Sequence, residues 1–242
     1  MEQCRRDVRR RHGLPEDHAL GIGVDRFDYT KGIEERLRAV ERMLEMRPEW
    51  IGRFTFVQIA APTRASIEDY KHYETRVRAL VDRINERFAK ADHPPVILKP
   101  EHHEPEQVYE YYRAADVCIV SSLHDGMNLV AKEFLSSRDD ERGVLLLSQF
   151  AGAARELPEA IIVNPYDTDQ CASALHIALT MAGGEQRARM RLMRSLIQEF
   201  NVFRWAGRML IDAASMRSRQ RLFSRTGGAG PIRVPIEPRA AQ

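Results

Sequence analysis

The sequence predicts a doubly wound α/β domain, in which helices cover both faces of a parallel β-sheet. Several short segments, such as 116–121 and 144–148, are continuous apolar runs, which is typical of strands that are buried on both faces. Amphipathic segments of helix length separate these runs. Strands that alternate with helices along a chain are characteristic of parallel sheets.

Strands are predicted where apolar or β-branched runs lie between turn residues, at 19–24, 54–60, 95–99, 116–121, 144–148 and 161–164. Helices are predicted at 33–46, 66–89, 105–115, 128–137, 168–181, 185–200 and 203–216. The pattern is clearest at 33–46, because Ile33, Leu37, Val40 and Leu44 fall on one stripe and Pro48 follows the helix end.

The 242 residues are predicted to form one large domain, preceded by an N-terminal segment and followed by a C-terminal tail. Residues 1–18 are predicted to form a solvated basic helix and a connector, because Glu2 and Asp7 interrupt the arginines; a nucleic-acid arm is the alternative. Residues 19–216 form the domain with its two closing helices. Residues 217–242, rich in Arg, Gly and Pro, are predicted to be disordered.

The composition favours a cytoplasmic globular protein. The chain is 43% hydrophobic, enough for a sizeable core, and its net charge of +2 argues neither for nor against a nucleic-acid partner. Cys4, Cys118 and Cys171 lie far apart without metal-binding spacing, so we expect reduced thiols. No stretch reaches 18 apolar residues, and the N-terminus lacks the apolar region of a secretory signal.

Residues 21–35, GIGVDRFDYTKGIEE, join a predicted buried strand to a polar turn and a helix. Arg26 and Lys31 therefore lie at the carboxyl end of a strand and beside a helix N-terminus, where α/β proteins bind ligands and anions are favoured. Two fixed cations there suit a diphosphate. Arg26 can donate two parallel hydrogen bonds to its oxygens, and Lys31 can act as a point charge. A surface turn with solvated charges is the alternative.

A second polar stretch, 121–133 (SSLHDGMNLVAKE), follows another apolar strand and enters a helix. Gly126 allows a close approach of backbone to ligand, and the amides of residues 127–130 are free at the helix start. Asp125 and Glu133, one at each end, are acceptors suited to sugar hydroxyls. Alternatively, Asp125 only caps the helix and Glu133 is solvated.

Five motifs together closely resemble the trehalose-6-phosphate synthase family, retaining nucleotide-sugar glycosyltransferases of the two-domain GT-B architecture. They are VDRFDYTKG at 24–32, QIA with PTR at 58–64, DGMNLVAKE at 125–133, SQFAGAA at 148–154 and NPY at 164–166. The resemblance covers about residues 13–215 and implies a Rossmann-like fold, the C-terminal half of such an enzyme. It also implies that the family's first domain, with most of the glucose 6-phosphate site, is absent.

The resemblance implies individual roles in binding the donor, UDP-glucose. Arg26 and Lys31 would hold the diphosphate and stabilise the departing UDP, which makes them the catalytic candidates. Asp125 would bind glucose hydroxyls, and Arg64 would reach the acceptor phosphate. The other implied contacts are Gly126 and the amides of Met127, Asn128, Leu129 and Val130 with diphosphate and glucose, Glu133 with the ribose, and the backbone of His103 with the base.

No metal or other cofactor is predicted. His102 and His103 are adjacent, so their side chains point apart, and no third ligand has suitable spacing for zinc. The acidic run 139–141 is interpreted as a solvated loop without ligand geometry.

Two classes of function stay open. The first is an α,α-trehalose-phosphate synthase whose acceptor site comes from another chain, a missing segment or a homo-oligomer, with UDP-glucose and glucose 6-phosphate as substrates. The second is a non-catalytic or regulatory module that binds nucleotide sugar. Within the enzyme class, a glucosylglycerol-phosphate synthase is the rival, although residues 58–64 and 148–150 favour the trehalose enzyme.

Overall fold

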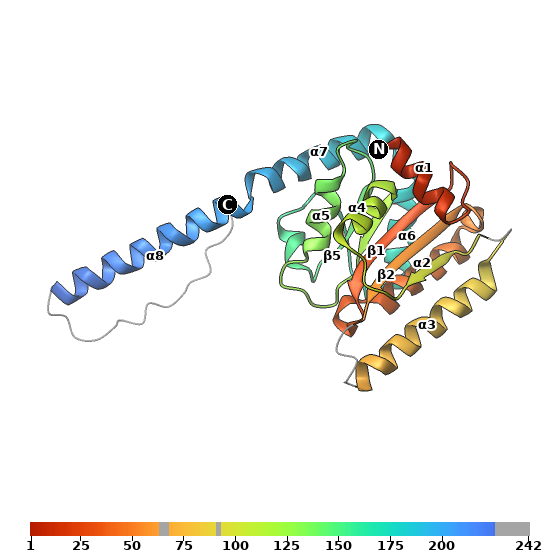
Figure 1. The fold of residues 1–242 in the computed structure, drawn as a ribbon, viewed down its shortest axis with the longest axis horizontal. Helices are drawn as coiled ribbons and strands as arrows, with labels where there is room; N and C mark the ends of the chain where they lie inside the picture. The colour runs from red at the N-terminus through yellow and green to blue at the C-terminus, as the bar shows by residue number, and fades with distance from the viewer. Residues whose placement is uncertain (63–67, 91–92, 226–242) are drawn as a thin grey trace. The chain divides into compact units, whose positions relative to one another are not determined.

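A computed structural model describes residues 1–62, 68–90 and 93–225, with only the backbone for 219–225. The unit Met1–Gln198 contains a six-stranded sheet in the order β3-β2-β1-β4-β5-β6. Figure 1 labels β1, β2 and β5 of this sheet. Its strands are β1 (Ala19–Arg26), β2 (Phe54–Ala61), β3 (Val96–Lys99), β4 (Val117–Val120), β5 (Val144–Ser148) and β6 (Ile161–Val163). All neighbouring strands pair in parallel, which confirms the predicted fold class.

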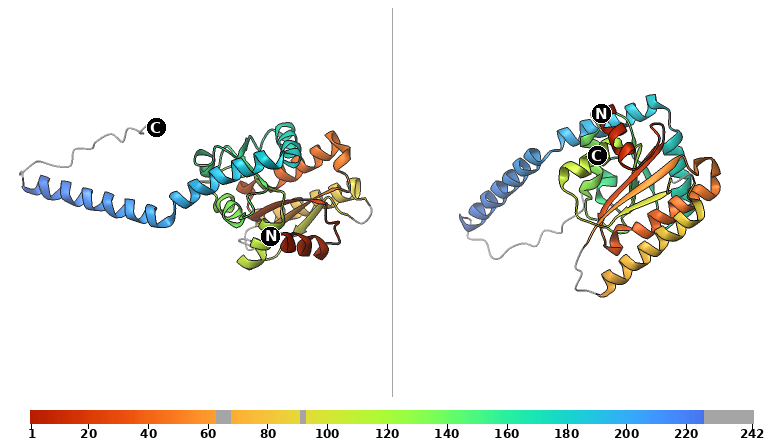
Figure 2. Two further views of the ribbon diagram at one scale, coloured as in Figure 1. Left: turned by 90° about the horizontal axis from the view of Figure 1, so that it is seen from above. Right: turned by 45° about the vertical axis from the view of Figure 1, so that its right-hand side comes forward.

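Helices cover both faces of this sheet, as the two further views show (Figure 2). They are α1 (Glu2–Arg11), α2 (Ile33–Met46), α3 (Glu68–Phe88), α4 (Pro105–Ala114), α5 (Leu129–Ser137), α6 (Thr168–Thr180) and α7 (Gly183–Glu199). A further helix, α8 (Val202–Arg225), belongs to a separate unit of the chain. Three short 3₁₀ turns are η1 (Tyr29–Lys31), η2 (Pro48–Trp50) and η3 (Gly152–Arg155).

Two apolar cores lie on opposite sides of the sheet, because successive strand side chains point to opposite faces. Phe54 and Phe56 of β2 pack in the core that contains residues of α2, α3 and α6. Val57 and Ile59 of the same strand pack in the core that contains residues of α1, α4, α5 and α7. Each fully buried side chain of this size contributes about 1.5–3 kcal/mol of transfer free energy. Burial on both faces explains why the strands read as continuous apolar runs.

The strand order reverses at the centre of the sheet. From β1 the chain adds β2 and then β3 on one side, whereas β4, β5 and β6 extend the other side. β1 and β4 are therefore hydrogen-bonded neighbours from which the chain leaves in opposite directions. In open α/β sheets, ligands bind outside the carboxyl ends of the strands at such a switch point.

Helix α1 packs against α4 and is not the solvated helix that the sequence pattern suggested. Val8 and Arg9 are both buried, with 1% and 2% exposure. The Arg9 guanidinium donates to Asp116 at 2.8 Å, to the carbonyl of His18 at 2.8 Å and to the carbonyl of Ala114 at 3.1 Å. The prediction failed because two of these acceptors, in Ala114 and Asp116, lie 105 and 107 positions along the chain and do not affect the local sequence pattern.

The observed C-terminal elements differ from the predicted ones. α8 continues to Arg225, so residues 217–225 are helical where disorder was predicted, and residues 226–242 lie outside the described part. The internal contacts divide the chain into one unit of Met1–Gln198 and another of Glu199–Gln242. Within the described residues, no helix combines the length and apolar character needed to cross a membrane.

A buried histidine pair lies just before β1. His18 is 3% exposed, its Nε2 lies 2.9 Å from the hydroxyl of Thr55, and its ring packs edge-on against His93 at 5.5 Å. Burial lowers the pKa of His18 to about 4, and the charges of His93 and Arg9 act in the same direction. The folded chain therefore holds His18 neutral at pH values where the unfolded chain protonates it.

We predict that the free energy of unfolding falls by up to about 3 kcal/mol through His18 as the pH is lowered from 6.5 to 4. The unfolded chain binds the proton more tightly across this range, so acid favours unfolding. Urea denaturation at pH 7 and pH 5 measures the loss in the parent and in His18→Gln, whose side chain does not titrate but retains hydrogen-bonding groups for Thr55. An identical loss in the two proteins would contradict the assignment.

Candidate functional site

The two polar stretches identified in the sequence meet at the switch point. Lys31 lies in the turn after β1 and Asp125 in the turn after β4, and Nζ of Lys31 is 2.7 Å from Oδ2 of Asp125. The backbones of these turns are also joined, because the amide of Leu123 donates to the carbonyl of Thr30 at 2.8 Å. A cation and a carboxylate from separate parts of the chain thus form one cluster at the carboxyl edge of the sheet.

The turn after β1 is fixed by an aspartate and a glycine. Oδ1 of Asp28 accepts hydrogen bonds from the amide of Thr30 at 2.9 Å and from its hydroxyl at 2.7 Å. Gly32 follows with φ of +64°, and a Cβ atom there would lie 2.1 Å from the carbonyl oxygen of Ser121. Glycine therefore permits both the left-handed backbone and the close packing that sets Lys31 beside the second turn.

Arg36 of α2 lies behind these turns and joins them to the sheet. Its side chain has 0% exposure, and Nη1 lies 2.8 Å from Oδ2 of Asp25 at the end of β1. The guanidinium donates to Gln58 of β2 at 2.9 Å, to Ser121 at 3.0 Å and to the carbonyl of Lys31 at 3.4 Å. This network fixes the backbone of Lys31 from the buried side.

Asp25 is the buried anion of this network. Burial raises the pKa of its carboxyl, and the charge of Arg36 acts against that shift. Oδ2 of Asp25 accepts no hydrogen bond from the described residues, so the 2.8 Å approach of Arg36 is mainly an electrostatic contact. Arg36 was not predicted as a site residue. Its spacing from Ile33 and Val40 on the apolar stripe of α2 was the available signal.

The turn after β4 is organised by Asn128, which adopts a φ of +75° and caps α5. Its Oδ1 accepts from the amide of Ala131 at 3.2 Å, while its Nδ2 donates to Ser122 and Asp125, each at 3.2 Å. Asn128 rather than Asp125 is thus the cap of this helix. The amides of Leu129 and Val130, also in the first turn of α5, have no intrahelical acceptor and are available to an anion.

The segment after β5 is hydrogen-bonded to the turn after β4 and holds it in place. The amide of Gly152 donates to the carbonyl of Asp125 at 2.9 Å, and the amide of Ala153 donates to that of Met127 at 2.8 Å. A Cβ atom on Gly152 would lie 2.0 Å from the carbonyl oxygen of Gly126. The SQFAGAA motif therefore holds the DGMN turn in place.

Asp125 is half-buried and receives several hydrogen bonds. Burial acts to raise the pKa of its carboxyl, but hydrogen bonds from Lys31, the amide of Met127 and Asn128 outweigh burial and lower it. The Met127 bond, at 3.3 Å, occupies one of the amides that was predicted to be free. Asp125 is consequently a carboxylate at neutral pH, able to accept further hydrogen bonds.

The other predicted residues have different surroundings. Arg26 is exposed and makes no ion pair with a described residue. Glu133 is half-buried, and its Oε2 accepts from the hydroxyl of Tyr112 at 3.2 Å, so it is not simply solvated. Nδ1 of His103 lies 3.0 Å from the carbonyl oxygen of Glu101. Arg64 lies outside the described residues.

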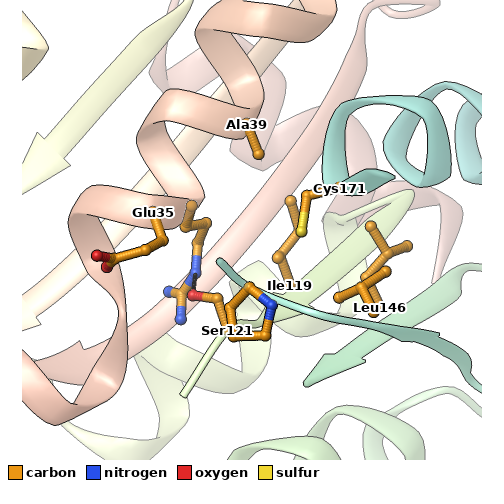
Figure 3. Close-up of a pocket in the computed structure, with 9 residues that line it drawn as sticks. Glu35, Ala39, Ile119, Ser121, Leu146 and Cys171 are labelled. Carbon is orange, nitrogen blue, oxygen red and sulfur yellow. Dashed lines mark hydrogen bonds between the residues drawn. The ribbon is translucent and has the colours of Figure 1, made fainter. Parts of the chain in front are cut away.

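A small hollow lies beside Arg36 and Ser121, between α2, α6 and the sheet (Figure 3). Its volume of about 10 Å³ holds roughly one water molecule, so it does not accommodate a nucleotide or a sugar. Within the part of the chain that the structure describes, no group of three or more His, Cys, Asp or Glu side chains could hold a metal ion.

The sequence matches the model of glycosyltransferase family 20 over residues 5–215. The chain belongs to this family. It is 39% identical over 189 residues to an α,α-trehalose-phosphate synthase [UDP-forming] of Pichia angusta, covering 78% of this chain and 40% of the relative. This result confirms the family resemblance inferred from the motifs.

Solved structures of the family share the fold. A synthase from Burkholderia xenovorans in complex with glucose-6-phosphate matches with a TM-score of 0.82 and 42% identity, covering 86% of this chain and 45% of that one. The E. coli protein bound with UDP-2-fluoro glucose matches with a TM-score of 0.82 and 35% identity, covering 86% and 46%. The chain therefore spans less than half the length of these relatives.

We predict that Arg36→Met lowers the free energy of unfolding by about 3–5 kcal/mol, because Asp25 is left as a buried charge without its cation. Urea denaturation measures the loss. Arg191→Met is the matched control, since Arg191 pairs with Glu141 at 2.7 Å on the surface and an exposed pair contributes about 1 kcal/mol or less. Equal losses in the two variants would contradict the structural role of Arg36.

We also predict that Gly152→Ala loosens the turn after β4, because its methyl group would overlap the carbonyl of Gly126. Amide hydrogen exchange of residues 121–133 should become faster, with a stability loss of about 1–3 kcal/mol. Gly184→Ala is the control, since a Cβ atom at Gly184 meets nothing within 4 Å. Unchanged exchange in Gly152→Ala would show that the turn does not depend on this contact.

Proposed function

We propose that this chain supplies the donor site of an α,α-trehalose-phosphate synthase (UDP-forming), which transfers glucose from UDP-glucose to glucose 6-phosphate with retention. The 2.7 Å contact between Lys31 and Asp125 carries the proposal. It places a group suited to a diphosphate beside one suited to sugar hydroxyls, at the sheet edge where α/β proteins bind ligands. Relatives solved with UDP-2-fluoro glucose and with glucose-6-phosphate support these substrates.

The proposed donor contacts follow the two turns. Arg26 and Lys31 hold the diphosphate, together with the amides of residues 128–130 at the start of α5. The amide of Met127, which was predicted with them, donates to Asp125 instead. Asp125 accepts hydrogen bonds from glucose hydroxyls, and Glu133 accepts them from the ribose. The backbone around His103 contacts the base. Arg26 suits this role because its guanidinium has no ion-pair partner among the described residues.

The proposed chemistry is stabilisation of the leaving group. Breaking the bond between glucose and the diphosphate builds positive charge on the sugar and negative charge on the departing UDP. Cations and amides that are fixed in advance stabilise this charge without reorganising during the reaction, and each such group is worth about 2.7–4 kcal/mol of barrier. The hydrogen-bonded turns of Lys31 and Asn128 provide this fixed arrangement.

The acceptor site requires more than the described residues. Arg64 is proposed to reach the acceptor phosphate, and the rest of that site would come from another segment, another chain or a second copy. The cytoplasm is the proposed compartment, because Cys4, Cys118 and Cys171 are all unpaired thiols.

We predict that the chain binds UDP and UDP-glucose in preference to ADP, as measured by calorimetric titration. Arg26→Ala and Lys31→Ala should each weaken UDP binding about ten- to a hundredfold, since each removes a hydrogen-bonded charge. Arg76→Ala, which breaks a surface pair with Glu34, is the control and should bind like the parent. Parent-like binding by both site variants would contradict the diphosphate assignment.

Turnover then tests the donor, because this chain is proposed to supply the donor site. The chain is combined with a separately expressed N-terminal half of a trehalose-phosphate synthase relative and with glucose 6-phosphate, and release of nucleotide is followed with UDP-glucose and with ADP-glucose. Selective release from UDP-glucose supports the UDP-forming synthase. Release from ADP-glucose alone would contradict it and favour the glucosylglycerol-phosphate alternative.

A further inference from the structure

The ion pair between Lys31 and Asp125 lies within the donor site itself. The two side chains are 20% and 14% exposed, so solvent screens this pair less than an ordinary surface pair. Asp125 is also held by Asn128 at 3.2 Å and by the amide of Met127 at 3.3 Å. The carboxylate therefore keeps its position while Lys31, a flexible side chain, is drawn towards it.

The two nucleotides proposed to bind this site, UDP and UDP-glucose, differ in the charge of the phosphate that lies next to Lys31. The terminal phosphate of a nucleoside diphosphate is a monoester-like group that loses its second proton near pH 6. In a nucleotide sugar the same phosphate is esterified to the sugar and carries one negative charge fewer. The sugar also brings neutral hydroxyls, which can donate to Asp125 without displacing Lys31.

We propose that Asp125 makes the site selective for the nucleotide sugar over the free nucleoside diphosphate by holding Lys31 in an ion pair. A terminal phosphate dianion must compete with Asp125 for the ammonium group of Lys31. The sugar nucleotide satisfies Asp125 with its hydroxyls. This inference rests on the proposed function and assigns Asp125 a second role, in which it weakens retention of the product.

Two other carboxylates near the turn after β1, Asp25 and Asp28, are already engaged. Asp25 is 4% exposed and faces Arg36, and Asp28 accepts both hydrogen bonds of Thr30. Arg26 is exposed and unpaired among the described residues, so it attracts both nucleotides. Asp125 is therefore the carboxylate whose charge gives the site different affinities for the two nucleotides.

The test is calorimetric titration of the parent and Asp125→Asn with UDP and with UDP-glucose at low salt. Asp125→Asn should bind UDP three- to tenfold more tightly and UDP-glucose no more tightly than the parent does. The ratio of the two dissociation constants is the readout, because a partly unfolded variant changes the stoichiometry but not this ratio. Glu156→Gln is the matched control, since Glu156 pairs with Lys132 at 2.6 Å and its loss removes the same charge.

A double-mutant cycle with Lys31→Gln separates the mechanism from simple repulsion. In the Lys31→Gln background, Asp125→Asn should tighten UDP binding less than twofold. An equal gain in both backgrounds, or no gain in the parent background, would overturn the inference while leaving donor binding intact. Failure of the parent to bind either nucleotide would overturn the proposed function and this inference together.

Discussion

The buried guanidinium of Arg36 is the constraint on which the candidate site depends. It contacts groups from β1, β2 and both turns, with no surface exposed to solvent. A buried cation is tolerated only where its donors find partners, and each unmet partner costs about 1–3 kcal/mol. These elements must therefore keep their relative positions, and the backbone of Lys31 is fixed as a consequence.

The sheet topology brings together residues that local sequence does not relate. Lys31 and Asp125 are 94 positions apart, and they meet because β1 and β4 are adjacent and parallel. Parallel strands place all their carboxyl ends at one edge, so turns after different strands converge there. The two apolar cores hold this arrangement from both faces of the sheet.

The features that were predicted correctly are those that depend on the local pattern of apolar and polar residues. All six strands of the sheet were found, and β2, β4 and β5 are near-continuous apolar runs because they are buried on both faces. The packing of α1 was missed, since the acceptors of Arg9 lie near the start of β1 and the end of α4. Arg36 was missed because a charge on an amphipathic helix is usually solvated. The motifs pointed to Lys31 and Asp125, but their direct contact follows from topology.

The two ion pairs of the site show how burial decides the role of a charge. Arg36 and Asp25 are 0% and 4% exposed, and their separation would leave a charge in the interior, so this pair is a permanent part of the fold. Lys31 and Asp125 are 20% and 14% exposed, so each side chain stays in contact with solvent. The buried pair therefore positions the more exposed one at the carboxyl edge of the sheet.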